Sequence, residues 1–70
     1  MVEVFKTNVV EAEMAEKLIE LIHEFFPHLE INFDLDDQDR ILRIQSLKEI
    51  DLSKVKLLCN SMGCIIEDLE

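Results

Sequence analysis

The chain has 70 residues, of which 49% are hydrophobic and 33% charged, with one glycine and one proline. This composition is too apolar for a disordered tail and too poor in glycine and proline for a linker, so it predicts one domain spanning residues 1–70. Sixteen acidic against seven basic residues give a formal net charge of -9. Such a charge repels nucleic-acid phosphates and anionic lipid surfaces, which argues against both as partners.

The two cysteines, Cys59 and Cys64, are too few for the disulfide framework of a small secreted domain. No basic and apolar leader precedes the first strand-like residues. The longest apolar runs are far shorter than the roughly 20 residues needed to span a bilayer. We therefore expect a cytoplasmic protein with reduced thiols and no membrane-spanning segment.

Residues 2–7 (VEVFKT) are rich in β-branched and aromatic side chains, which predicts a strand. Two sets of side chains compete for the buried face of this strand. We expect Val2 and Val4 to point into the core, which leaves Phe5 on the outer face of the sheet.

A helix is predicted over residues 11–26, because apolar residues recur there at helical spacing and acidic residues occupy the other side. Its buried stripe is expected to consist of Met14, Leu18, Leu21, Ile22 and Phe25. Pro27 disfavours helical geometry in the residue before it and so marks the end of the helix. His23 and His28 are five residues apart, which fits no i, i+4 pair of metal ligands, and we expect both to be solvated.

Residues 29–35 alternate strictly between apolar and polar side chains, which is the period of a strand with one buried face. The polar residues 36–39 (DDQD) predict a turn, and residues 40–45 (RILRIQ) complete a hairpin. The side chains of this second strand divide between a core face and an outer face, with Leu42 and Ile44 on the first and Ile41, Arg43 and Gln45 on the second.

The second helix has the clearest start and stop signals. Asp51 can cap its first turn, and Ile50 is placed to pack against Val55 as a hydrophobic staple. Its inner stripe is expected to consist of Leu52, Val55, Leu58, Cys59 and Met62. Gly63 follows the last helical residue, where a left-handed backbone is needed, and residues 64–69 form a short closing strand.

The element order is strand, helix, strand, strand, helix, strand, which predicts an α+β fold of the ferredoxin-like βαββαβ type. In that fold the four antiparallel strands lie in the order fourth, first, third, second. Both helices cover one face of the sheet, and the other face stays open to water or to a partner.

Several features together resemble the heavy-metal-associated domain family of small copper chaperones and metal-ATPase modules. They are the strand of residues 2–7, the helix stripe Met14, Leu18, Ile22 and Phe25, the pair Ile31 and Phe33, and the ending Met62-Gly63-Cys64. In that family a Met-x-Cys-x-x-Cys loop opens the first helix, and two thiolates bind a soft ion such as monovalent copper. The resemblance therefore implies a site at the start of the first helix.

The residues at that loop differ from the family pattern. The resemblance places Glu11 and Met14 at the two cysteine positions, or Ala12 and Ala15 in a register counted from Pro27. Both registers lack the thiolates, so the metal activity of the family does not carry over, and no cofactor is expected. The chain resembles a degenerate member without the metal-binding cysteines.

Cys64 comes where members of that family usually have an aromatic residue near the metal loop, so the resemblance brings it close to Glu11 and Met14. These three residues are the candidates for an altered, weaker soft-metal site. A small-ligand regulatory domain of the ACT type has the same element order. Such domains usually carry a glycine before the first helix, where this chain has residues 7–9 (TNV).

No Ser/His/Asp grouping, nucleophile elbow or glycine-rich phosphate loop occurs, so we do not expect an enzyme. The leading hypothesis is a non-catalytic interaction module. Its predicted contact surface is the open face of the sheet, where Phe5, Ile41 and Arg43 are expected. The occupant is either an unidentified protein partner or a second copy in a weak homodimer.

Overall fold

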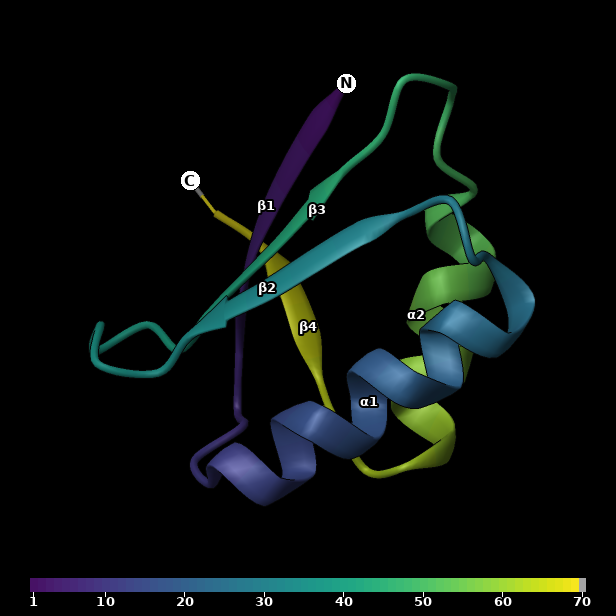
Figure 1. Cartoon of the computed structure of the whole chain (residues 1–70). Helices are drawn as coiled ribbons and strands as arrows, with labels where there is room; N and C mark the ends of the chain where they lie inside the picture. The colour runs from purple at the N-terminus through teal and green to yellow at the C-terminus, as the bar shows by residue number, and fades with distance from the viewer. Residues whose placement is uncertain (70) are drawn as a thin grey trace.

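The computed structural model describes residues 1–69, which form four strands and two helices (Figure 1). In chain order these are β1 (Val2–Thr7), α1 (Ala12–Phe25), β2 (Glu30–Asp34), β3 (Ile41–Gln45), α2 (Leu52–Ser61) and β4 (Ile66–Asp68). All neighbouring strands are antiparallel, in the order β2-β3-β1-β4. The α+β class and the predicted strand order are therefore confirmed.

Both helices pack on the same face of the sheet, as Figure 1 shows. Directly opposed residues in an antiparallel ladder share a face. Phe5 is opposite Leu42, which is in turn opposite Phe33. These side chains meet the inner faces of the helices in one core, whose buried members include Leu18, Ile22, Ile31, Ile44, Val55 and Cys59.

The prediction for β1 is wrong, because its register is shifted by one residue. Phe5 is only 1% exposed and lies in the core, whereas Val2 is 54% exposed. Burying a phenyl ring removes about 150–250 Å² from water, more than a valine offers. Each face of β1 also carries one charged residue, Lys6 beside the valines and Glu3 beside Phe5, so the larger apolar side chain decides which face is buried.

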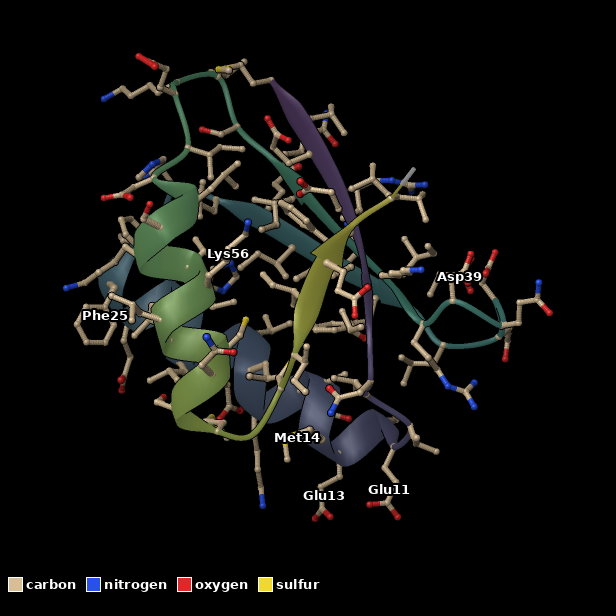
Figure 2. All side chains as sticks on the ribbon, turned by 180° about the vertical axis from the view of Figure 1, so that it is seen from behind. Glu11, Glu13, Met14, Phe25, Asp39 and Lys56 are labelled. Atoms are coloured by element: carbon tan, nitrogen blue, oxygen red, sulfur yellow. The ribbon has the colours of Figure 1, made fainter. Side chains whose placement is uncertain are left out.

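The phenyl ring of Phe5 is also covered from above by a side chain of α2. The Nζ atom of Lys56 lies 5.8 Å from the ring centroid, and Figure 2 shows Lys56 reaching from α2 toward the sheet. An ammonium group in this position is attracted to the ring face. Lys56 therefore closes the core beside the short strand β4.

The helix α1 starts and ends within one residue of the prediction, but its buried stripe is rotated. Its fully buried residues are Ala15, Leu18 and Ile22. Phe25 is 52% exposed, contrary to expectation, and Phe26 packs against the core in its place. The ring of Phe25 lies instead beneath Lys54, whose Nζ is 5.8 Å from the centroid.

The signals around α2 are confirmed. The backbone N–H of Lys54 donates to Asp51 Oδ1 at 3.1 Å, which is the predicted N-cap. Gly63 has φ +81°, and a Cβ at this position would have no heavy atom within 4 Å. The glycine is therefore needed for its backbone conformation and not for space.

The connection between β2 and β3 contains one feature that the sequence did not indicate. Arg40 was expected to begin the strand, but it has φ +51° and precedes it. Its backbone N–H donates to the Asp37 carbonyl at 3.0 Å, and its Nη1 donates to the Leu35 carbonyl at 2.9 Å. Arg40 thus fixes the turn.

The last strand is shorter than expected. The sequence predicts a strand over residues 64–69, and the structure has the strand β4 over Ile66–Asp68.

Within residues 1–69, neither helix has the length and apolar character required to cross a bilayer.

Candidate functional site

The loop between β1 and α1 meets the loop between α2 and β4 at one end of the molecule. Between them lies a cavity of about 350 Å³, lined by Asn8, Val9, Val10, Glu11, Met14, Gly63 and Cys64. The structure therefore brings together all three predicted soft-metal candidates.

Two polar side chains hold these loops in place. The Asn8 side chain donates from Nδ2 to the Gly63 carbonyl at 3.4 Å and accepts the Ile65 N–H on Oδ1 at 2.9 Å. Thr7 Oγ1 accepts the Val9 N–H at 3.1 Å and donates to the Arg40 carbonyl at 2.7 Å. Sequence reasoning missed the role of Asn8, because its partners are 55 and 57 residues away along the chain.

The two cysteines are reduced, buried and adjacent to each other. The Cys64 backbone N–H donates to the Cys59 carbonyl at 3.0 Å. A side-chain hydrogen bond with Cys64, together with burial and the neighbouring charge, raises the pKa of the Cys59 thiol. The same hydrogen bond lowers the pKa of Cys64, and burial opposes that effect. Cys64 is therefore the thiol of the pair that ionises more readily, and it is the one that lines the cavity.

These residues do not form the two-thiolate centre of heavy-metal-associated domains, as the absence of the cysteine motif led us to expect. Only one thiol lines the cavity, and Cys59 lies behind it in the core. Figure 2 shows Glu11 and Glu13 pointing away from the body of the molecule. Across residues 1–69, no group of three or more His, Cys, Asp and Glu side chains is placed to hold a metal ion. What remains is one thiol, the Met14 thioether and an exposed carboxylate.

The second predicted site is the open face of the sheet. The ladders place ten side chains on this face: Val2, Val4, Lys6, Glu30, Asn32, Asp34, Ile41, Arg43, Gln45 and Glu67. Arg43 is there and exposed, as predicted. Ile41 is there but only 8% exposed, and it belongs to no part of the core beneath the helices. Phe5 is absent from this face and is unavailable to a partner.

The open face carries charged side chains of both signs. Its bases are Lys6 and Arg43, and its acids are Glu30, Asp34 and Glu67, so two positive and three negative charges give a formal sum of -1. The chain carries -9. Lys6 Nζ lies 3.9 Å from the Glu67 carboxylate, a pair that is exposed on both sides. Per residue, the ten side chains of this face are about as acidic as the whole chain, so the feature that matters is the arrangement of both signs of charge.

The histidines are on the surface, as predicted, but one of them has a defined contact. The Nε2 atom of His23 is 2.7 Å from the Leu29 carbonyl oxygen, which joins α1 to the residue just before β2. Five residues separate His28 from His23, and the two imidazoles belong to no metal-binding group within residues 1–69. His23 therefore has a structural contact.

Neither known protein families, nor curated proteins, nor solved structures gave a match to this chain.

Proposed function

We propose that this chain is a non-catalytic protein-interaction module on a ferredoxin-like scaffold, and that its open sheet face pairs with a second copy of the chain. One observation carries the proposal: the face left free by the helices holds basic side chains on its central strands and acidic side chains on its outer strands, so it is complementary to a second copy of itself. Opposite charges can then meet across the contact, which offsets part of the repulsion between two acidic chains. We propose the resemblance to heavy-metal-associated domains for the scaffold and not for metal binding.

The composition of the face suits a contact between identical surfaces. A two-fold interface brings the same patch against itself, so it needs both members of each attractive pair on one surface. Here the basic side chains lie on the central strands β1 and β3, and acidic side chains lie on the outer strands β2 and β4. Arg43 of one copy can therefore approach a β2 carboxylate of the other. Val2 and Val4 supply apolar area between the charges.

The size of the face limits the strength of this contact. Four strands of at most six residues cover only a few hundred Å² per partner, below the ~800 Å² of a standard interface. We therefore expect dissociation constants in roughly the micromolar to millimolar range. Added salt should strengthen the dimer, because it screens the repulsion between two chains of charge -9.

Sedimentation velocity over a range of concentrations tests the proposal. Arg43→Glu reverses a charge on the open face, and Lys48→Glu makes the same charge change at an exposed residue between β3 and α2. We expect concentration-dependent dimerisation of the wild type, retained in Lys48→Glu and lost in Arg43→Glu. A monomer at all concentrations and at high salt would contradict the proposal, as would equal loss in both variants.

A second candidate function is binding of a soft monovalent ion by Cys64 with Met14. The observation that favours it is the shared cavity, which joins a thiol of lowered pKa to a thioether. The test is a titration of the reduced protein with monovalent copper against a competing chelator, repeated with Cys64→Ser and Met14→Leu. Binding tighter than about micromolar that both substitutions weaken supports this function. Binding that neither substitution weakens, or no binding at all, would contradict this function.

A further inference from the structure

The outer edge of β2 is the longer free edge of the sheet. Strand order places β2 and β4 at the edges, and β2 has five residues against three in β4. Within residues 1–69, β2 pairs only with β3, and no other backbone hydrogen bond involves residues 30–34. An edge strand presents alternating unpaired N–H and C=O groups. The β2 edge can therefore accept a further strand without rearrangement of the sheet.

Two shallow cavities run along this edge, between β2 and α1. One of about 430 Å³ is lined by Ala12, Ala15, Glu16, Ile19 and residues 32–36. The other, of about 440 Å³, is lined by His23 and residues 27–32. Both include Asn32 at the centre of the strand. Side chains of an added strand that point toward the helix layer would thus find space over the small residues of α1.

The charged side chains along the β2 edge are acidic, which favours a basic strand as the ligand. The acidic side chains that line the two cavities are Glu16, Glu30, Asp34 and Asp36, and neither cavity is lined by a lysine or an arginine. The Glu30 and Asp34 side chains are both exposed on the open-face side of β2. Basic side chains directly opposite them would form favourable cross-strand pairs.

The same charges disfavour a second copy of this chain at the β2 edge. In a two-fold antiparallel pairing centred on Asn32, Glu30 of each copy would lie opposite Asp34 of the other. Like charges directly opposite each other destabilise a ladder. Self-pairing in this register is therefore disfavoured, and charged edge residues are one way in which proteins avoid edge-to-edge aggregation.

We propose that the β2 edge binds an extended segment of a different protein as a fifth strand, with lysine or arginine facing Glu30 and Asp34 and apolar residues over the α1 side. The segment has the pattern basic, apolar, polar, apolar, basic, because residues four apart in a strand share a face. Main-chain hydrogen bonds supply the attachment, and the alternating side chains supply the selectivity. The main-chain attachment lies at the β2 edge and not on the open face, although Glu30 and Asp34 contribute to both contacts. Slowed exchange of β2 amides therefore distinguishes strand binding from the dimer of the proposed function.

The test is a titration of isotope-labelled protein with a capped peptide of sequence Lys-Val-Thr-Val-Lys. Binding is monitored by amide chemical shifts and by hydrogen exchange. The matched peptide replaces both lysines with glutamate. We expect saturable shifts centred on residues 30–34, slowed exchange at alternate amides of β2, and no binding of the glutamate peptide. Shifts spread evenly over the acidic surface would overturn the proposal, as would no saturation at about 1 mM peptide.

Charge-reversed variants make the test specific. Glu30→Lys/Asp34→Lys should weaken the lysine peptide about tenfold or more and bind the glutamate peptide instead. Glu13→Lys/Glu49→Lys makes the same net change at exposed residues away from the edge and should keep the wild-type preference. Equal effects of the two double variants would mean that only overall charge matters, which contradicts the proposal. If the first double variant does not fold, Glu30→Gln/Asp34→Asn replaces it. This variant should also weaken binding of the lysine peptide, by a smaller factor.

Discussion

The two faces of the sheet are built from alternate residues of the same strands, yet their surroundings differ. On the covered face, Phe5 and Leu42 are opposite each other and almost fully buried beneath the helices. On the open face, Val4 is opposite Arg43, and the surface mixes both signs of charge. Substitutions at neighbouring positions of one strand should therefore have separable effects. Changes on the covered face should alter stability, and changes on the open face should alter association.

The largest difference in stability should come from alanine substitutions on the two faces of β1. Phe5→Ala should lower the free energy of unfolding by about 3–5 kcal/mol, because it removes a buried ring and leaves a cavity. Val2→Ala, three positions earlier and exposed, should change it by less than about 0.5 kcal/mol. Urea denaturation of the two variants measures the difference. Equal effects would mean that the register of β1 is the alternative one.

A smaller loss is expected at the end of α2, where the helix layer turns back into the sheet. Gly63→Val should destabilise the protein by about 1–2 kcal/mol, because a β-branched residue is strained at φ +81°. Gly63→Asn should cost less, since asparagine tolerates this conformation. Thermal unfolding compares the two variants. A valine variant as stable as the wild type would show that the left-handed conformation is not required.

The start of α2 should be sensitive to a similar degree. Asp51→Ala removes the acceptor for the Lys54 N–H and should cost about 1 kcal/mol. Asp51→Asn keeps an oxygen in the same place and should recover most of the loss. Circular dichroism during urea denaturation gives both values. An asparagine variant as unstable as the alanine variant would argue against the cap.

The cover over Phe5 should contribute least among these features. Lys56→Met keeps the aliphatic stem and removes the ammonium group above the ring, which should cost about 0.5–1 kcal/mol. Lys54→Met, at the exposed ring of Phe25, should cost no more than about half of that. Guanidinium denaturation of both variants sharpens the contrast between buried and exposed rings. A larger loss at Lys54 would contradict it.

The helix boundaries could be predicted from the sequence because their signals are local. Pro27 ends α1, Asp51 begins α2, and Gly63 ends it, each through the conformation or hydrogen bonding of adjacent residues. The face of β1 could not be predicted in this way. In the segment VEVFKT both alternating sets contain apolar side chains, and only the packing of Phe5 against Leu42 and Lys56 separates them.

The candidate sites depended still more on long-range contacts. The resemblance placed Cys64 near Glu11 and Met14, and the cavity between the loops does contain all three. The hydrogen bonds of Asn8 that close this cavity, and the free edge of β2, have no short-range pattern in the sequence. They follow from the strand order and from residues that meet only after folding.

The proposal that the open face carries association and the covered face carries stability is tested most directly by a dilution series. Amide chemical shifts are recorded at each protein concentration. If the open face carries the contact, shifts between concentrated and dilute protein should be confined to residues that surround Val4 and Arg43 on β1 and β3. The outer surfaces of α1 and α2 should not change. Concentration-dependent shifts centred on the helices, with none on the open face, would contradict the proposal.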